Sequence, residues 1–441
     1  MDKVDVAIVG AGVAGCLAAR DLARAGHSVV LVEKHGRAIL GHDWWDSVLK
    51  EVFAEVDLPL PEPPERLNSS GPAIIYPPLE TVALDAPERP NMLSVDRKLL
   101  ARRQLKYAEE AGARFIDKTA VIGPVLENGK VVGIIISRSG GETEKLSARL
   151  VIDASGFSGA IRSRMTEPLG FQRNVEREGT FATYREIRAN TSENMENLIV
   201  FGKDNGVRWV NRAQDGLVDF FAGVIDFPDR LNPREIVEQM VKQTGGAGTE
   251  VLRAGYGAPI PVRHCFDSFV APGLMLCGDA ACQCNPMDGS GIASSLRAAH
   301  IAAKAAHAAL ENDRLDISGL WQYNTAYKRS QGARFVPLDA IQKFMVSEPK
   351  INLEILFRRR IIATEDFWGK GEMKNSSTME MLIKLLRLLD RPRFIVRLTR
   401  TMVTAKELYN HYLDYPEEYD EKSFDAWRTK KRELFLRIRR N

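Results

Sequence analysis

The sequence has few of the residues that build disulfide frameworks and metal clusters. It contains five cysteines in 441 residues, and an odd number in a long chain argues against a disulfide framework. Cys282 and Cys284 stand two positions apart, but no second pair of cysteines or histidines follows at ligand spacing. We therefore expect neither a zinc site nor an iron–sulfur cluster.

Apolar runs long enough to cross a bilayer are also missing, which excludes a transmembrane helix. The chain opens directly into an apolar strand at residues 4–9, without a charged leader, an apolar leader core or a cleavage site. These absences predict a cytoplasmic protein. The apolar content of 44% and the charged content of 27% are typical of a globular enzyme.

The net charge of +3 is small but unevenly distributed. Residues 351–441 contain 20 Lys and Arg against 14 Asp and Glu, so this basic C-terminal region carries +6 and the rest of the chain −3. Its segments 381–400 and 424–438 mix bulky apolar residues with cations. This pattern fits peripheral contact with the inner face of a membrane, although such stripes more often belong to helices that pack on the protein's own core. We expect no nucleic-acid partner.

The hydrophobic pattern indicates a mixed α/β chain. Residues 2–34 indicate strand, glycine turn, helix and strand, and residues 180–260 alternate polar and apolar positions, as in an antiparallel sheet with one covered face. The other expected elements are a helix over 94–112, a hairpin of 114–125 and 130–137 closed by Asn128-Gly129, a strand over 273–277, a helix over 291–310 and a mainly helical last hundred residues.

A dinucleotide-binding motif lies between the first strand and the first helix. The segment Gly10-Ala11-Gly12-Val13-Ala14-Gly15 matches G-x-G-x-x-G. Gly10 permits the tight turn, Gly12 lets the backbone approach a pyrophosphate, and Gly15 lets helix and strand pack closely. The N–H groups of the helix N-terminus then face the phosphates.

The second strand ends at Glu33, which is followed by Lys34. A carboxylate at this position accepts hydrogen bonds from both ribose hydroxyls of an adenosine and repels a 2′-phosphate. The N-terminal motif therefore favours FAD or NAD over NADP.

A later segment distinguishes FAD from NAD through a family resemblance. The residues Gly278-Asp279-Ala280-Ala281, then Pro286 and Gly289-Ser290-Gly291-Ile292, resemble the second flavin fingerprint of the aromatic-hydroxylase and geranylgeranyl reductase superfamily. The resemblance implies that Asp279 binds the ribityl chain. It also implies that a helix N-terminus at Gly289–Ile292 lies near the flavin pyrimidine ring, where positive potential stabilises an anionic reduced flavin.

Two further segments resemble the same superfamily. Residues 151–162 are similar to its D-A-x-G-x-x-S-x-x-R motif, which implies a cofactor role for Asp153 and Gly156. Val95-Asp96-Arg97 is similar to its V-D-R segment, whose Arg reaches the cofactor. Taken singly, Asp153 could instead cap a turn and Arg97 could form a surface ion pair.

Among the branches of the superfamily, the geranylgeranyl reductases fit best. They are FAD enzymes that reduce isolated C=C bonds of polyprenyl chains. The sequence departs from this branch in two places. Of its Y-x-W-x-F-P element only Trp209 matches, and residues 41–45 replace its cysteine-containing C-G-E element with Gly-His-Asp-Trp-Trp.

The loop at residues 41–45 supplies candidates for catalysis and substrate contact. By the resemblance it approaches the isoalloxazine, so His42 could exchange a proton near neutral pH beside Asp43, although a surface histidine is an equal alternative. Trp44 and Trp45, like Trp209, could form a flat wall for a substrate, or could be ordinary core residues.

Cys282 and Cys284 lie inside the flavin-side loop. Either thiol could donate a proton, and small packing residues are the alternative. Arg208 and Arg212 would suit an anionic head group, or they could pair on the sheet surface.

We predict an α/β fold with a Rossmann-like FAD-binding domain of the GR2 type, an interleaved antiparallel substrate domain and a helical C-terminal extension. The expected boundaries are 1–75, 92–175 and 265–335 for the FAD-binding domain, 76–91 and 176–264 for the antiparallel domain, and 336–441 for the helical region.

The predicted function is reduction of a C=C bond in a hydrophobic, isoprenoid-type substrate by reduced FAD. No dedicated NADPH domain is visible, so an external donor, reduced ferredoxin or NAD(P)H, would supply electrons. Three alternatives remain: a flavin monooxygenase or halogenase, an electron-transfer flavoprotein that passes electrons to a quinone, and a non-catalytic flavin-binding protein.

Overall fold

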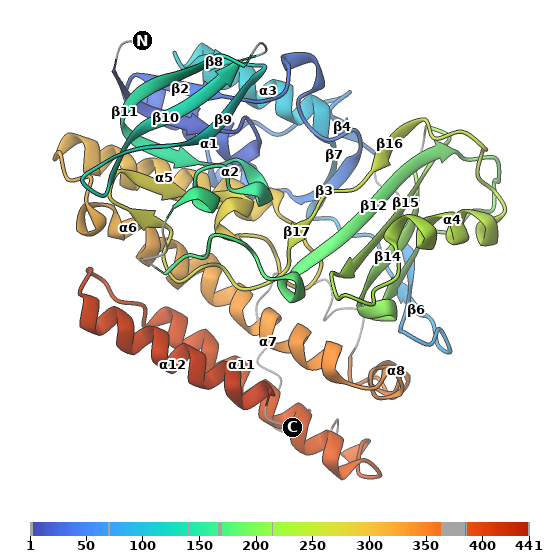
Figure 1. The fold of residues 1–441 in the computed structure, drawn as a ribbon. Helices are drawn as coiled ribbons and strands as arrows, with labels where there is room; N and C mark the ends of the chain where they lie inside the picture. The colour runs from blue at the N-terminus through green and yellow to red at the C-terminus, as the bar shows by residue number, and fades with distance from the viewer. Residues whose placement is uncertain are drawn as a thin grey trace.

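The computed structural model describes residues 3–68, 71–138, 141–165, 170–213, 215–362, 384 and 386–439. Two large β-sheets lie beside each other, and the long helices of the C-terminal region run below both of them in Figure 1. Part of the basic segment at 381–400 falls outside the residues that the structure describes.

The first sheet contains the parallel strands predicted near the N-terminus. Its order is β18-β19-β11-β1-β2-β8, and β10 and β9 extend it from β11 as antiparallel strands. The strands are β1 (Val4–Val9), β2 (Val29–Val32), β8 (Arg114–Ile116), β9 (Thr119–Glu127), β10 (Lys130–Arg138), β11 (Thr143–Asp153), β18 (Val270–Ala271) and β19 (Leu274–Leu276). β1 and β2 are apolar and almost wholly buried, as parallel strands covered on both faces must be.

The predicted hairpin forms, with one difference in its first strand. Asn128 and Gly129 adopt φ values of 50° and 78° between β9 and β10, which is the backbone of a type I′ turn. The first strand was expected to run unbroken over 114–125. It is divided into β8 and β9 because Lys118 takes a left-handed φ of 50° and turns the chain.

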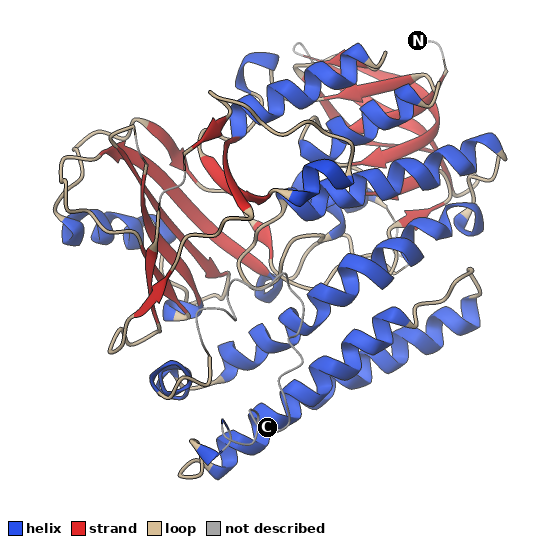
Figure 2. Ribbon diagram, turned by 180° about the vertical axis from the view of Figure 1, so that it is seen from behind, coloured by secondary structure: helices blue, strands red, loops and turns tan. Residues whose placement is uncertain are grey.

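Helices cover the parallel strands (Figure 2). α1 (Val13–Arg24), α3 (Arg97–Glu110) and α5 (Ile292–Glu311) pack together, flanked by α2 (Glu51–Glu55) and α6 (Ile317–Tyr327). The buried side of α5 is mostly alanine, which allows close approach to α1. α3 and α5 match the predicted helices within three residues at each end.

The second sheet is the predicted antiparallel one. Its order is β16-β12-β15-β14-β13-β5-β6, with β17 paired to β12. The strands are β5 (Ala73–Tyr76), β6 (Leu84–Ala86), β12 (Thr180–Ala189), β13 (Leu198–Phe201), β14 (Gly206–Arg212), β15 (Leu217–Ile225), β16 (Arg253–Tyr256) and β17 (Ile260–Pro261). A small third sheet has the order β3 (Trp45–Leu49), β7 (Met92–Asp96) and β4 (Arg66–Leu67).

Alternation along the strands gives the second sheet two different faces. Val210 and Phe220 pack with Val237 of α4 (Pro233–Thr244) in a separate small core. Their neighbours Trp209 and Phe221 lie on the opposite face, which turns toward the rest of the molecule. The polar–apolar alternation in the sequence therefore reflects a sheet with one face closed by a helix.

The C-terminal helices pack on one another below the sheets (Figure 1). They are α7 (Ala333–Ser347), preceded by a π-helical turn at Lys328–Gly332, α8 (Lys350–Arg358), α11 (Pro392–Leu413) and α12 (Glu421–Arg439). Within the part of the chain that the structure describes, no helix is long and apolar enough to cross a membrane.

A buried ion cluster joins the second sheet to the small sheet. Arg185 of β12 donates from Nε and Nη2 to the carboxylate of Asp219 on β15 at 2.8 and 2.7 Å. Its Nη1 binds Asp46 of β3 at 2.8 Å, and Arg97 binds the other oxygen of Asp46 at 2.6 Å. Arg185 is 5% exposed and Asp219 is fully buried. Through the shared Asp46, Arg185 and Arg97 thus link β12 to the start of α3.

Replacing Arg185 with Met should destabilise the fold by about 3–5 kcal/mol, because a buried carboxylate loses its partner. Burial alone would raise the pKa of Asp46, but Arg185 and Arg97 lower it. The stabilisation is therefore complete above the unfolded Asp pKa of about 3.9 and declines as the pH falls below that value. Thermal denaturation from pH 7 to pH 3 measures both effects.

Arg177→Met is the matched control. It removes a pair with Asp226 in which the arginine side chain is 60% exposed, and such pairs contribute about 1 kcal/mol or less. Equal losses in the two variants would show that the Arg185 cluster does not hold the sheets together.

Candidate functional site

A connected cavity of about 2130 Å³ reaches from the N-terminal glycine turn to the C-terminal helices. Its walls come from the first turns of α1 and α5, the inner face of the second sheet, α7 and α11. Ordinary ligand pockets measure about 300–1,000 Å³. This cavity is therefore large enough for more than one ligand group.

The three glycines of the N-terminal motif play different parts. A Cβ on Gly10 would lie 2.6 Å from the Ala154 oxygen, and a Cβ on Gly15 would lie 1.9 Å from the Gly10 oxygen. The protein's own packing thus requires both. A Cβ on Gly12 would meet no atom within 4 Å and would project into the cavity. The space beside Gly12, at the N-terminus of α1, fits the pyrophosphate of the expected FAD.

The end of β2 presents an acid to the same region. Glu33 accepts hydrogen bonds from the N–H groups of Ala11 and His35 at 2.8 and 2.9 Å, and it lines the cavity together with the exposed Lys34. Its carboxylate stands next to the glycine turn, where the sequence predicts the adenosine ribose.

The second fingerprint lies beside the first turn of α1, where a Cβ on Gly278 would be 3.3 Å from the Ala14 Cβ. Gly278, Asp279, Gly289, Gly291 and Ile292 all line the cavity, and the first turn of α5 opens into it. Asp279 is half-buried and accepts a hydrogen bond from the Cys284 thiol at 3.0 Å. Burial raises the pKa of Asp279 and raises that of Cys284 further. Cys284 therefore keeps its proton at neutral pH.

Besides Gly15, the predicted cofactor residues Asp153 and Pro286 do not line the cavity. The carboxylate of Asp153 is fully buried and accepts hydrogen bonds from the backbone of Ser155, Ile161 and Arg162. Pro286 is buried, and its carbonyl accepts a hydrogen bond from Gln342 of α7. These residues shape their loops, and their predicted contact with the cofactor stays a prediction.

Arg97 and Gly156 do line the cavity. Gly156 has a φ of 73°, and a Cβ there would meet no atom within 4 Å. Like Gly12, it leaves space that the protein itself does not fill. Ala14 also lines the cavity, whereas Gly15 serves only the packing of α1.

His42 is part of an aromatic cluster. Its ring stacks on Trp44 with centroids 4.3 Å apart and an angle of 9°, and Tyr256 completes the cluster. Burial, and then the charge of Arg97, lower the pKa of His42 to about 3. The imidazole is therefore neutral near pH 7, and its role in proton exchange stays a prediction.

Asp43 is held by two cations. It accepts hydrogen bonds from Arg253 at 2.9 Å and from Lys98 at 3.0 Å. Burial would raise the pKa of Asp43, but these partners outweigh it and lower the pKa. Asp43 is therefore an ionised residue that anchors the loop. Trp45 is 7% exposed and forms part of the cavity wall.

The inner face of the second sheet carries a flat aromatic surface. Trp209 stacks on Phe221 with centroids 3.9 Å apart, and its Nε1 donates to Asp219 at 2.9 Å. Arg208 and Arg212 alternate with Trp209 and point to the other face. There Arg208 pairs with Asp204 and Arg212 donates to a backbone carbonyl. Both partners lie in turns or loops beside the sheet, and neither arginine lines the cavity.

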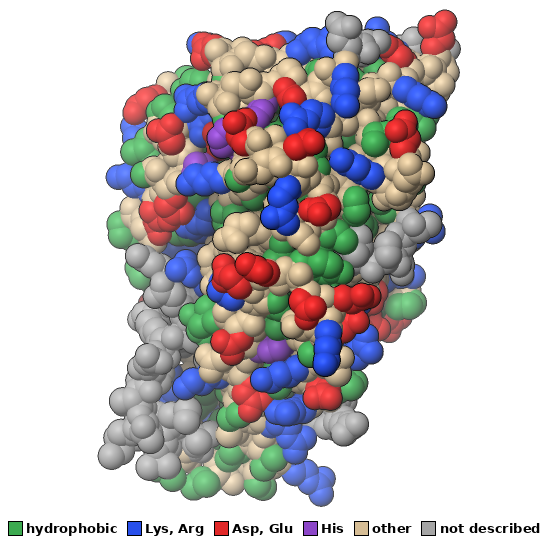
Figure 3. Space-filling view, turned by 90° about the vertical axis from the view of Figure 1, so that its left-hand side faces the viewer, with side chains coloured by type: hydrophobic (Ala, Val, Ile, Leu, Met, Phe, Trp, Pro, Cys, Tyr) green, Lys and Arg blue, Asp and Glu red, His purple; other side chains and the backbone are tan. Residues whose placement is uncertain are grey.

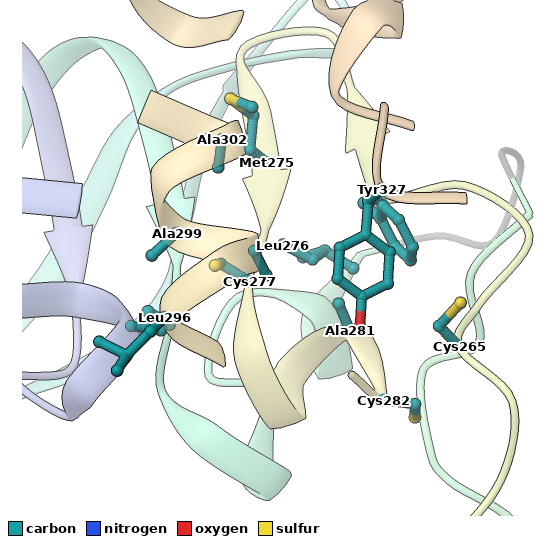
Figure 4. Close-up of a cluster of buried hydrophobic side chains, with 14 of the residues drawn as sticks. Cys265, Met275, Leu276, Cys277, Ala281, Cys282, Leu296, Ala299, Ala302 and Tyr327 are labelled. Carbon is teal, nitrogen blue, oxygen red and sulfur yellow. The ribbon is translucent and has the colours of Figure 1, made fainter. Parts of the chain in front are cut away.

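Cys282 is remote from the cavity. Figure 4 shows it among buried apolar side chains with Cys265 and Cys277. Burial raises the pKa of its thiol to about 12. Cys282 does not line the cavity and packs in the core, which is the alternative that the sequence left open for it. The described cysteines are all free.

Three charged residues beside the cavity could not be recognised as a cluster from the sequence. These are the members of the ion cluster, Asp46, Arg185 and Asp219, and Trp209 donates a hydrogen bond to this cluster. They are more than 30 residues apart in the sequence. The apolar sides of α7 and α11 also line the cavity. Only the polar residues on the cavity face of the predicted sheet could have indicated the ion cluster.

Gly12→Val tests the glycine turn. We expect at least a tenfold loss of bound FAD, because the side chain fills the space for the pyrophosphate, with little change in the melting temperature of the flavin-free protein. Gly10→Ala should instead destabilise the flavin-free protein, since its Cβ meets backbone atoms. Flavin absorbance and thermal denaturation measure the two effects, and full flavin in Gly12→Val would contradict the assignment.

Solved structures of flavoproteins share this fold. A geranylgeranyl bacteriochlorophyll reductase-like protein from Thermoplasma acidophilum aligns with a TM-score of 0.74 and 20% identity, over 91% of this chain and 100% of that one. A myxobacterial chondrochloren halogenase aligns with a TM-score of 0.62 and 18% identity, over 96% and 99%. The predicted Rossmann-like FAD-binding fold is confirmed.

The chain is also similar to a characterised class of reductase. It is 26% identical over 440 residues to the digeranylgeranylglycerophospholipid reductase of Sulfolobus acidocaldarius, covering 97% of this chain and 96% of the relative. The predicted resemblance to geranylgeranyl reductases is thereby confirmed.

Family models agree on the cofactor. The model described as FAD dependent oxidoreductase matches residues 5–45, which include the glycine turn and Glu33. The model described as FAD binding domain matches residues 77–330, more than half of the chain. The chain therefore belongs to the FAD binding domain family and is an FAD-dependent oxidoreductase.

Proposed function

We propose that the chain reduces carbon–carbon double bonds of an isoprenoid lipid. The observation that carries this proposal is the continuity of the cavity. The space beside the glycine turn and the flavin fingerprint continues along apolar side chains of α7 and α11, among them Phe335, Leu338, Ile341, Phe344, Leu398 and Met402. A long hydrocarbon chain fits such a passage better than a small aromatic substrate does.

Residues from both fingerprints would hold FAD. Gly10, Gly12 and Ala14 would hold the pyrophosphate, and Glu33 the ribose. Asp279 would bind the ribityl chain, while the N–H groups at the start of α5 would face the pyrimidine end of the ring, where positive potential favours an anionic reduced form. Bound and reduced FAD supplies the hydride.

The side chains around the substrate would orient it and exclude water. The stacked pairs His42–Trp44 and Trp209–Phe221 offer flat apolar surfaces against which an alkene can lie. Addition of a hydride to an alkene also requires a proton. The Cys284 thiol lines the cavity and holds its proton at neutral pH, so it can deliver the proton directly or through water.

The substrate class is supported by the relatives. The Sulfolobus acidocaldarius relative is named as a reductase of digeranylgeranylglycerophospholipid, a lipid that carries unsaturated isoprenoid chains. An external donor, reduced ferredoxin or NAD(P)H, would reduce the flavin, since the described residues form no separate nicotinamide-binding domain.

Peripheral contact with a membrane would give the lipid access to the cavity. Arg393, Val396, Arg400 and Val403 follow one face of α11, and all four are exposed. Val403 is 53% exposed and also lines the cavity, so the passage opens at this face. Cations among exposed apolar residues suit an anionic bilayer surface. On the face that Figure 3 shows, by contrast, basic and acidic side chains are interspersed.

Anaerobic reoxidation of the dithionite-reduced enzyme tests the proposal. A polyprenyl lipid should reoxidise the flavin, while air reoxidises it only slowly. Ile341→Trp should slow the lipid reaction at least tenfold, because the indole blocks the apolar passage, and Ser347→Trp, an exposed position on the same helix, should not. Absorbance of the oxidised flavin follows both reactions.

The alternatives give different results in the same experiment. Fast reoxidation by oxygen through a flavin adduct, stimulated by an aromatic or halide substrate, would favour the monooxygenase or halogenase. Electron transfer to a quinone without any effect of Ile341→Trp would favour an electron-transfer flavoprotein.

Vesicle binding tests the membrane contact. Arg393→Glu with Arg400→Glu should weaken binding to phosphatidylglycerol vesicles at least 30-fold, since each lost cation removes about 1 kcal/mol near an anionic surface and each new carboxylate is repelled. Arg234→Glu on α4 is the control, because it changes an equally exposed cation away from the passage. Flotation of the protein with vesicles measures binding. Equal binding by all variants would exclude the α11 face.

A further inference from the structure

Three potential metal ligands converge outside the cavity. His27 lies in the turn between α1 and β2, and His307 and Glu311 lie four residues apart at the end of α5, so they share one face of that helix. One ligand atom from each residue can be chosen so that all three lie within 4.8 Å of one another. None of the three lines the cavity.

The two imidazoles already face each other. His27 Nε2 and His307 Nδ1 are 2.9 Å apart, and the ring centroids are 5.1 Å apart at an angle of 59°. Zn–N bonds of about 2.0–2.1 Å in a tetrahedral site place two nitrogens about 3.3 Å apart. The rings therefore need to separate by only a few tenths of an ångström to hold an ion. Glu311 is exposed, so its carboxylate is free to move to the third position.

The surrounding charges admit a dication. The nearby Arg149 is bound by Asp5 at 3.1 Å and by Asp313 at 3.0 Å, so its charge is compensated by two carboxylates. His27 and His307 are half-buried, which restricts their rotation more than that of surface histidines.

We propose that His27, His307 and Glu311 bind one divalent transition-metal ion of the zinc type, with water in the remaining position. Two imidazoles and one carboxylate suit Zn²⁺ and do not suit Mg²⁺, which prefers oxygen ligands. The ion would connect the start of β2 to the end of α5. The other ends of these two elements, at Glu33 and Gly291, lie at the cavity.

Calorimetric titration of the chelator-treated holoenzyme with ZnCl₂ at pH 7.5 tests the site. We expect one ion per chain, an affinity that falls at least tenfold in His27→Ala and His307→Ala, and a smaller loss in Glu311→Gln. His300→Ala is the matched control, because His300 lies on the same helix but pairs with Asp21. Zn²⁺ should raise the melting temperature of the wild type and of the control, but not of His307→Ala.

The proposal is overturned if the wild type binds no stoichiometric Zn²⁺, or if His307→Ala and Glu311→Gln bind it as the wild type does. Glu311→Gln changes an exposed side chain, so it remains informative even if His27→Ala fails to fold. Flavin absorbance and the metal-free melting temperature verify that each variant is intact. This result is independent of the lipid reductase proposal, because the ligands lie outside the cavity.

Discussion

The form of the cavity depends on the position of Arg185. Its guanidinium holds a carboxylate from its own sheet and one from the small sheet, and Arg97 at the start of α3 shares the second carboxylate. A buried arginine whose N–H groups lacked hydrogen-bond acceptors would destabilise the fold. The second sheet, the small sheet and the start of α3 are therefore held at the distances at which these hydrogen bonds form. Trp209 donates a hydrogen bond to the same Asp219. The cluster therefore also orients Trp209 in the aromatic wall of the cavity.

The two ends of the cavity differ in how far apart in the sequence their residues lie. The cofactor end is made locally, by glycine turns at the N-termini of α1 and α5, where backbone N–H groups and open space take the place of side chains. The apolar end is made by distant elements, the second sheet and the C-terminal helices, which meet only in the folded chain. Under the proposed function, the cofactor end would supply the chemistry and the apolar passage would select the substrate.

The sequence was most informative where function needs a particular backbone. Gly10 and Gly12 could be recognised because a tight turn and a phosphate exclude side chains, and the alternation over residues 180–260 predicted a sheet with one covered face. The protonation of His42 could not be predicted, because it follows from stacking on Trp44 and from the charge of Arg97. The role of Asp153 stayed open in the sequence because a carboxylate that organises a turn and one that binds a ligand have the same sequence pattern, and the structure shows that its carboxylate organises the turn. The domain boundaries stay a prediction.

The most direct measurement of the central claim is the mass of the product after turnover with a geranylgeranyl lipid in D₂O under anaerobic reducing conditions. The proposed reaction predicts that each reduced double bond gains two hydrogen atoms and that at least one of them is solvent-derived deuterium, since the proton would come from exchangeable groups such as the Cys284 thiol. Recovery of unchanged lipid while FAD is bound and reduced, or addition of oxygen or halogen to a substrate under aerobic conditions, would contradict it.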